Sequence, residues 1–309
     1  MLFSSISFLY YFLPVVLILY FLVPYKFKNL LLLVASLFFY FYGEPIYTLV
    51  MVLASFSGYI HGLWIDKQRG KNYNKIPLVS SIVSSIGTLM FFKYTDFFIE
   101  NFNALFNTDI SLLKIALPIG ISFYTFQILS YTIDVYRGNA AVQKSFIDFA
   151  TYVSLFPQLI AGPIVRYTSV EAQLESRIHS WEKTAYGINR FIIGLSKKVI
   201  LANTLGQLND ILDNLTEKTV SLYWISAISF MLQVYYDFSG YSDMAIGLGK
   251  IFGFDFPENF NYPFISKSIS EFWKRWHMSL GTWFRDYVYI PMGGKRVNKI
   301  KWIRNILVV

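Results

Sequence analysis

The first apolar run of the chain covers residues 6–23 and reads ISFLYYFLPVVLILYFLV. Its length is close to the roughly 20 residues that an α-helix needs to cross the hydrocarbon core of a bilayer. No basic segment precedes the run and no small-residue cleavage site follows it, which distinguishes it from a secretory signal peptide. We therefore expect residues 6–23 to form a retained transmembrane helix.

Further apolar runs follow at short intervals, at Leu30–Tyr42, Ile46–Ile65, Ile76–Ile99 and Leu112–Val135. The connections between the runs alternate in charge. Lysines and arginines gather around residues 26–28, 66–75 and 136–144, whereas connections 43–45 and 100–111 contain acidic residues and no basic ones. Basic connections remain in the cytoplasm when helices insert. We therefore predict a multi-pass protein with its N-terminus outside and the three basic connections inside.

The composition indicates that lipid is the solvent for much of the surface. Of 309 residues, 55% are hydrophobic and 15% are charged, and the mean hydropathy is +0.44; soluble domains contain about a quarter charged residues. The net charge of +8 is spread between apolar runs, which favours membrane lipids over nucleic acid as partners. The absence of cysteine excludes disulfides and thiolate sites within this chain, and no motif typical of a metal site is found.

The pattern of apolar runs changes after residue 145. Within Phe146–Val165, Pro157, Gly162 and Pro163 interrupt a run that is short for a membrane span. Broken backbone at membrane depth is tolerated where protein buries it or a cavity receives it. A re-entrant segment that lines a cavity and a proline-kinked helix are both compatible with this pattern. We expect residues 1–145 to form helical spans and residues 146–309 to form the core of a single transmembrane domain.

Charged residues lie inside two later apolar runs. Asp237 and Asp243 fall within residues 222–254, and intramembrane carboxylates of this kind usually face a bundle interior and meet a partner. They are candidates for a substrate site, or they are structural acids bound by tyrosines or helix ends. Residues 186–205 contain Arg190, Lys197 and Lys198. These cations either snorkel to the membrane interface or face a cavity.

A candidate catalytic residue lies in EFWKRWHMSLGTWFRDYVYIPMGGKR, residues 271–296. We expect Trp273–Phe284 to form a helix at or within the membrane interface, with His277 directed toward a cavity. The helical spacing places Trp273, His277, Leu280 and Phe284 on one apolar face, opposite most of the charged residues. An imidazole among aromatic rings stays neutral, and a neutral imidazole can accept a proton from a hydroxyl. The alternative is a core histidine that binds a backbone carbonyl. His61 and His179 are weaker candidates.

Other side chains in this stretch suit an acyl-transfer site. Trp273 and Trp276 could form the wall of a tunnel that keeps water from a thioester, although tryptophans also gather at membrane interfaces. Arg275 and Arg285 could bind a phosphate-bearing acyl carrier or anionic lipid headgroups. We include these four residues, with Asp237 and Asp243, in a candidate substrate or tunnel site.

Four motifs occur in an order that resembles the membrane-bound O-acyltransferase family. They are LPIGISFYTFQILSYTIDVYRG (117–138), FPQLIAGPIVRY (156–167), YYDFSGYSDMAIGLGKIFGFDFPENFNYPF (235–264) and WKRWHMSLGTWFRDYVYIPMGGKR (273–296). The bacterial branch that modifies alginate is the nearest in pattern, and the D-alanyl transferases of teichoic acid synthesis are also similar. The resemblance implies an all-α polytopic membrane enzyme with broken or re-entrant helices around a central tunnel.

The resemblance also assigns a role to His277. It matches the first of two histidines typical of the bacterial branch, and the second lies in a WHG-type motif further along. No histidine follows His277 in this sequence, and residues 306–309 begin a further apolar run. We therefore expect this chain to be the N-terminal part of a longer protein, which the apolar ending favours, or a truncated member of the family, and in both cases to be inactive by itself as an acyltransferase.

The implied reaction is transfer of an acetyl group to an exported, alginate-like polysaccharide at the bacterial cytoplasmic membrane. The implied donor is acetyl-CoA or another acyl thioester, with no bound cofactor, and an extracytoplasmic acetyltransferase is the expected partner. Two alternatives stay open. One is transfer of D-alanyl or longer acyl groups to teichoic acid or lipid, and the other is a non-catalytic membrane channel or scaffold for acyl or polymer export.

Overall fold

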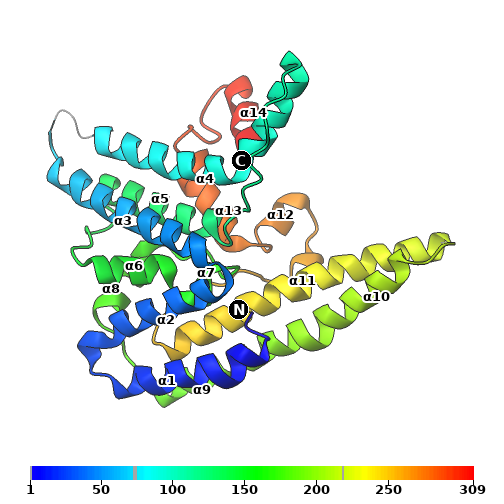
Figure 1. The fold of residues 1–309 in the computed structure, drawn as a ribbon, viewed down its shortest axis with the longest axis horizontal. Coiled ribbons are helices and arrows are strands. Elements are labelled where there is room, and N and C mark those ends of the chain that lie inside the picture. Colours follow the sequence, from blue (N-terminus) through cyan, green and yellow to red (C-terminus); the bar gives the residue numbers. More distant parts are fainter. Residues whose placement is uncertain (1, 72–74, 218) are drawn as a thin grey trace. The chain divides into compact units, whose positions relative to one another are not determined.

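The structure, a computed structural model, describes residues 2–71, 75–217 and 219–309. Every regular element in these ranges is a helix (Figure 1), which confirms the all-α prediction. The chain forms two compact units, Leu19–Ile160 with Arg166–Leu174, and Met1–Ile18 with Ala161–Val165 and Glu175–Val309. We call them the α2–α8 unit and the α9–α14 unit. The single transmembrane domain expected over residues 1–309 stays a prediction.

The α2–α8 unit contains most of the apolar runs of the first half of the chain. Its helices are α2 (Lys28–Gly43), α3 (Pro45–Lys67), α4 (Lys75–Phe106), α5 (Ile121–Arg137), α6 (Phe146–Ser154), α7 (Phe156–Leu159) and α8 (Tyr167–Glu175). Helix α5 packs against α3 and α4, while α2 packs against α6. Fully buried aromatic side chains form the core of this unit, among them Tyr124, Tyr131, Phe149 and Tyr152.

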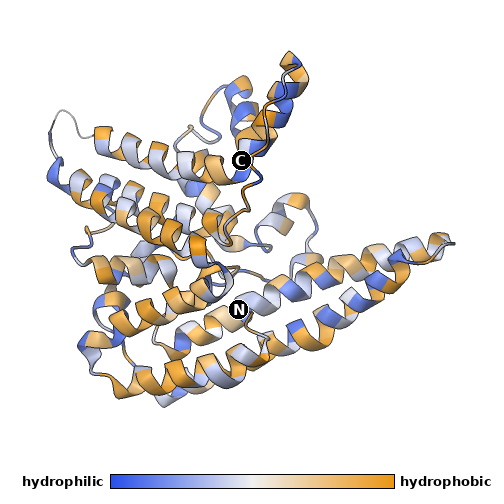
Figure 2. Cartoon of the chain, in the orientation of Figure 1, coloured by the Kyte–Doolittle hydropathy of each residue, from blue (hydrophilic) through white to orange (hydrophobic). Residues whose placement is uncertain are grey.

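Two helices of this unit are long and apolar enough to cross a membrane. They are α3, with 23 residues, and α4, with 32 residues. Hydrophobic residues recur along both helices (Figure 2), and only 28% and 11% of their most apolar windows are buried within the protein, so many apolar side chains are exposed. A core helix of a soluble protein would instead bury its apolar face. The exposed apolar surfaces of α3 and α4 therefore support the expectation of a lipid environment.

The other three predicted spans are helical but shorter. Residues 7–22 form a short apolar helix that comprises η1 (Ser7–Phe12) and α1 (Leu13–Leu22). Helices α2 and α5 have 16 and 17 residues. Their crossing of a membrane stays a prediction. In the basic connection 66–75, residues 72–74 lie outside the described residues.

The predicted fifth run, Leu112–Val135, was wrong at its start, because α5 begins only at Ile121. Gly120 precedes the helix with a φ of +76°, in the left-handed region that glycine adopts without strain. A Cβ atom on Gly120 would lie 2.7 Å from the carbonyl oxygen of Leu159. The close approach of these two backbones requires glycine at this position, and Pro118 also disfavours a helical conformation at the residue before it.

Within Phe146–Val165 the helix is interrupted at Leu155, two residues before Pro157, between α6 and α7. The backbone groups freed by the break bind buried side chains of the same unit. The Phe156 backbone N–H donates to the Ser36 hydroxyl at 3.1 Å, and the Gln158 amide donates to the carbonyl of Tyr152 at 2.6 Å. Because these bonds satisfy polar groups at the turn, a sharp turn is tolerated in an apolar core. Whether the segment is re-entrant stays a prediction.

The α9–α14 unit is built on a long helix, α11 (Val220–Ile251). The polar sequence YYDFSGYSD, residues 235–243, does not interrupt this helix. Against α11 pack α9 (Trp181–Ser196), the π-helical turn η3 (Lys197–Ala202) and α10 (Asn203–Asp213). Five shorter elements follow within residues 252–309: η4 (Pro263–Ile265), α12 (Ile269–Trp273), α13 (Met278–Phe284), η5 (Arg285–Tyr289) and α14 (Lys299–Val308).

Glycines allow the backbones of α9 and α11 to touch. A Cβ atom on Gly194 would lie 2.5 Å from the carbonyl oxygen of Gly240, and one on Gly187 would lie 2.6 Å from that of Gly247. The glycines are seven residues apart on both helices, so each pair lies on one helix face. Small residues in contact are typical of helix pairs in membranes, where dispersion forces and polar contacts replace the hydrophobic effect.

Candidate active site

His277 lies at a break between two short helices. Helix α12 ends at Trp273 and α13 begins at Met278, and His277 has a φ of +46° in the left-handed region. The continuous helix predicted across Trp273–Phe284 was therefore wrong. The backbone of this break bonds to a distant segment: the N–H of Met278 donates to the carbonyl of Asn259 at 3.0 Å, and the N–H of Asn261 donates to the carbonyl of Arg275 at 2.9 Å.

The side chain of Asn259 is fully buried beside the imidazole. Its Oδ1 lies 3.0 Å from Nδ1 of His277. The same oxygen accepts hydrogen bonds from the backbone N–H of Ser279 at 3.2 Å and from the Ser279 hydroxyl at 2.8 Å. The amide nitrogen of Asn259 donates to the hydroxyl of Ser242 at 3.0 Å. The site thus joins the break before α13 to helix α11 through a buried polar network.

The imidazole is half-buried, and one of its faces is aromatic. The rings of Phe238 and His277 meet edge to face, with their centroids 4.9 Å apart. His277 lies outside the two candidate spanning helices, and burial lowers its pKa to about 4. The ring is therefore neutral at physiological pH. Among the described residues Nε2 has no hydrogen-bond partner, so this atom remains available to accept a proton.

Trp276 belongs to an aromatic cluster beside His277, whereas Trp273 does not share its side of the site. The ring of Trp276 stacks on Phe272 with a centroid distance of 5.6 Å and meets Phe260 edge to face at 5.0 Å. Trp273 is 58% exposed. The aromatic surroundings of Trp276 suit a residue in the wall of a tunnel. The expected grouping of Trp273 with His277 on one helix face was wrong, because the helix is broken between them.

The two arginines of the candidate site bind neighbouring carboxylates. Arg275 donates to Glu271 at 3.0 Å and to the carbonyl of Asn261 at 3.2 Å. Arg285 donates to Asp286 at 2.7 Å, and its side chain is 59% exposed. Arg275 therefore helps to hold the segment that contains Asn259, and neither guanidinium is free of a carboxylate partner. Their roles toward a substrate or headgroup stay predictions.

Asp243 is the centre of a buried cluster of charges. Its carboxylate, 8% exposed, lies 2.7 Å from the Arg190 guanidinium and 2.6 Å from the Lys197 ammonium. Arg190 also binds Glu258 at 2.6 Å. Arg190 and Lys197 therefore face α11 within the helix bundle, whereas the sequence left open whether they snorkel to the membrane interface or face a cavity. The partners of Asp243 are cations and not the tyrosines or helix ends of the structural alternative, and its candidate role in a substrate site stays a prediction.

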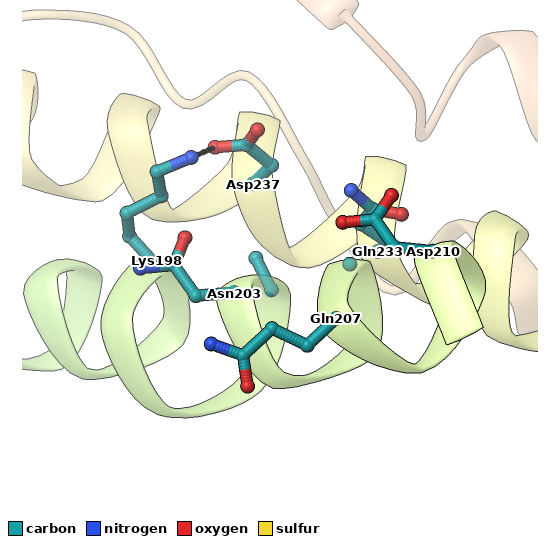
Figure 3. Close-up of a pocket in the computed structure, with 8 residues that line it drawn as sticks. Lys198, Asn203, Gln207, Asp210, Gln233 and Asp237 are labelled. Atoms are coloured by element: carbon teal, nitrogen blue, oxygen red, sulfur yellow. Dashed lines mark ion pairs between the residues drawn. The ribbon is translucent and has the colours of Figure 1, made fainter.

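Asp237 lines a separate polar pocket of about 300 Å³ between α11 and the segment η3–α10 (Figure 3). An ion pair of 2.7 Å joins Asp237 to Lys198. The other lining residues are Ala202, Asn203, Gly206, Gln207, Asp210 and Gln233. The residue after Asp237 on the same helix, Phe238, contacts the His277 ring. Helix α11 therefore presents Asp237 to this pocket and Phe238 to the ring of His277, and the candidate role of Asp237 in a substrate site stays a prediction.

Within the described part of the chain, the remaining histidines and acids form no candidate metal site. His61 lies in the α2–α8 unit, where its Nε2 is 3.0 Å from the hydroxyl of Ser80 and its Nδ1 is 2.7 Å from the carbonyl of Ser57. His179 lies in the α9–α14 unit and would contact a Cβ atom placed on Gly253. Within residues 2–71, 75–217 and 219–309, no group of three or more histidine or acidic side chains could hold a metal ion.

The comparison of sequences places the chain in a known family. Residues 140–308 match the model of the MBOAT, membrane-bound O-acyltransferase, family. A probable alginate O-acetylase of Pseudomonas aeruginosa is 44% identical over 99% of this chain and 60% of its own length. The peptidoglycan O-acetyltransferase of Helicobacter pylori is 35% identical over the whole chain and 65% of its own length. The teichoic acid D-alanyltransferase of Bacillus subtilis is 34% identical over 62% of this chain and 49% of its own length.

This chain therefore spans about three fifths of the length of the alginate O-acetylases that it matches. The family match covers α6–α14, including the break at His277 and the segment of Asn259. The resemblance inferred from the four motifs is confirmed. Proteins of this family are integral to membranes, in agreement with the apolar outer surfaces of α3 and α4. The chain belongs to the membrane-bound O-acyltransferase family.

Proposed function

We propose that the protein of which this chain forms a part is an O-acetyltransferase that modifies an exported polysaccharide at the bacterial cytoplasmic membrane. The observation that carries the proposal is His277, a neutral imidazole whose Nε2 has no hydrogen-bond partner among the described residues. It lies in the part of the chain that matches the family. A base of this kind can take the proton of an acceptor hydroxyl during attack on an acyl group. Acetyl is favoured because the alginate O-acetylases align over 99% of the chain.

The proposed reaction begins when Nε2 of His277 accepts the proton of the acceptor hydroxyl. The hydroxyl oxygen bonds to the acyl carbon, the carbon–sulfur bond of the thioester breaks, and the thiolate leaves with the electron pair. The proton on the imidazolium then passes to the thiolate, which restores the neutral ring. The donor in this proposal is acetyl-CoA or another acyl thioester. The aromatic cluster around Trp276 would keep water away from it.

The acyl group on the product tests this proposal. Cells that make the full-length protein should contain polysaccharide with ester-linked acetate, and cells that lack it should lose that acetate. We expect mass spectrometry of the released acyl groups to find acetate and no D-alanine. D-Alanine would favour the teichoic acid alternative, since that relative is similar over 62% of the chain. Polysaccharide that is exported less but acetylated normally per residue would favour the scaffold alternative.

We also propose that the chain is multi-pass, with its N-terminus outside the cytoplasm. This proposal rests on the alternation of basic and acidic connections around α3 and α4, the two candidate spans. The sequence contains no cysteine, so a single introduced cysteine reports its own side of the membrane. In intact cells an impermeant thiol reagent should label Asp109→Cys and should not label Lys71→Cys until the membrane is opened. Labelling in the opposite order would reverse the topology.

The proposed partners are membrane lipids, a polysaccharide acceptor and an extracytoplasmic acetyltransferase. Lipid contact is supported by the apolar exteriors of α3 and α4. The acceptor class is supported by the relatives, whose names give alginate and peptidoglycan as the modified polymers. Capture of the full-length protein from crosslinked membranes should recover the acetyltransferase partner only in cells that export the polymer.

A further inference from the structure

We infer that Asn259 is a positioning residue that holds His277 in the tautomer with its proton on Nδ1 and thereby directs the bare Nε2 to the acceptor hydroxyl. The inference rests on the proposed function for the role of Nε2, and it assigns a residue that is not part of the sequence-based candidate site. The argument depends on which atoms of the network can donate and which can accept.

The orientation of the Asn259 amide follows from the backbone of Ser279. A backbone N–H can only donate, so the atom of Asn259 that lies 3.2 Å from it must be the carbonyl oxygen. The amide nitrogen then points to the Ser242 hydroxyl, 3.0 Å away, which can accept. The reversed amide would place two donors against each other at Ser279. Since the side chain is fully buried, no solvent could compensate for that clash.

The hydroxyl of Ser279 strengthens this assignment. It accepts a hydrogen bond from the backbone N–H of Ile164 at 3.0 Å and lies 2.8 Å from Oδ1 of Asn259. Oδ1 of Asn259 carries no proton, so the hydroxyl must donate its single proton in this short contact and cannot also donate it to Nδ1 of His277, which lies 3.5 Å away. Two donors from Ser279 therefore fix an acceptor at that position.

The tautomer of His277 follows from this acceptor. Nδ1 lies 3.0 Å from Oδ1 of Asn259, an atom that cannot donate, so the hydrogen bond requires a proton on Nδ1. A neutral ring has only one such proton, which leaves Nε2 with its lone pair exposed. Free imidazole side chains favour the opposite tautomer, with the proton on Nε2. The contact with Asn259 therefore selects the form that can act as a base at Nε2.

The segment that carries Asn259 is itself fixed. Its backbone carbonyl accepts from the N–H of Met278, the residue after His277, so the two side chains are held together by the chain on both sides. The preceding residue, Glu258, binds Arg190 through both carboxylate oxygens, at 3.1 and 2.6 Å. Arg190 is in turn bound to Asp243 of α11. The position of Asn259 is thus tied to the α9–α11 helix pair.

The test is to read the tautomer directly by ¹⁵N NMR in the full-length protein labelled with [¹⁵N]histidine. The ring signals that disappear in His277→Gln identify this residue. We expect wild-type His277 to carry its proton on Nδ1. In Asn259→Ala the proton should move largely to Nε2, whereas Asn259→Asp keeps an acceptor at the same place and should retain the wild-type tautomer. Asn261→Ala, which removes an exposed amide two residues away, is the matched control and should change nothing.

Kinetics provide a second measurement on the same variants. For histidines that bind metals, loss of the hydrogen-bond partner that orients the ring lowers metal affinity or activity by about 10–100-fold. We expect a decrease of that size in kcat for Asn259→Ala, with little change in KM, and substantial recovery in Asn259→Asp. A wild-type proton on Nε2, or an Asn259→Ala protein that keeps its Nδ1 proton, would overturn the inference. Because the NMR result does not need turnover, a failure of the proposed function would leave this test intact.

Discussion

The Asp243→Ala protein should lose about 3–5 kcal/mol of unfolding free energy relative to wild type. Removal of this carboxylate leaves the Arg190 and Lys197 side chains, 22% and 28% exposed, without their common buried partner. A charge left without a partner in a region of low dielectric destabilises the folded state by far more than the original ion pair stabilised it. Denaturant-induced unfolding of the full-length protein in mixed micelles measures the effect.

Asp237→Ala is the matched control for this experiment. It removes the same group from the same helix, but Asp237 is 47% exposed and binds only Lys198 among the described residues. Ion pairs open to solvent contribute less than about 1 kcal/mol. Equal losses in the two variants would contradict the structural role that the geometry gives to Asp243.

The second large effect is expected for His277→Gln in the full-length protein. Loss of a general base lowers turnover by about 10²–10⁴-fold, because the acceptor hydroxyl then keeps its proton during attack. Incorporation of labelled acetyl groups into polysaccharide by membranes with matched protein levels measures the loss. His61→Gln changes a histidine of the α2–α8 unit that binds Ser57 and Ser80, and it should retain the wild-type rate. A His277→Gln enzyme with normal turnover would refute the assignment of the base.

The pH dependence provides a further check of the same residue. Burial lowers the pKa of His277 to about 4, below the ordinary value of about 6.5, so the reactive neutral ring persists to more acidic pH. We expect kcat/KM not to change with the protonation of His277 around pH 6 and to fall only as the pH approaches 4. The unfolded chain takes up the proton first, so the stabilising contribution of neutral His277 is complete above about pH 6.5 and is lost as the pH falls toward 4. A midpoint near 6.5 would show that the ring is solvated.

The helices of the first half of the chain could be predicted because their signal is local. A long apolar run such as 46–65 or 76–99 forms a helix wherever it is placed in lipid, and α3 and α4 follow these runs closely. The break at His277 has no such local signal. The sequence around it has helical periodicity, but its backbone hydrogen bonds go to residues 259–261, and only the folded chain brings these segments together.

The partners of the predicted site residues were hidden for the same reason. Asp243 was recognised as an expensive buried acid, yet its cations lie some 50 residues earlier on a helix whose register is set by glycine contacts. Asn259 was missed because a buried asparagine in a non-helical segment has no periodicity to reveal it. The chemistry of the side chain could have indicated it, because the N–H and C=O groups of an amide close to aromatic residues both need hydrogen-bond partners.

The glycine contacts between α9 and α11 limit how these two helices can move relative to each other. A shift of one helix along the other by a single turn, about 5.4 Å, would bring side chains onto surfaces that leave no room for a Cβ atom. It would also separate Asp243 from both of its cations. The two helices must therefore move as one body. Since α11 carries Phe238 and Ser242, the ring that contacts His277 and the hydroxyl that binds Asn259 move together with the α9–α11 pair.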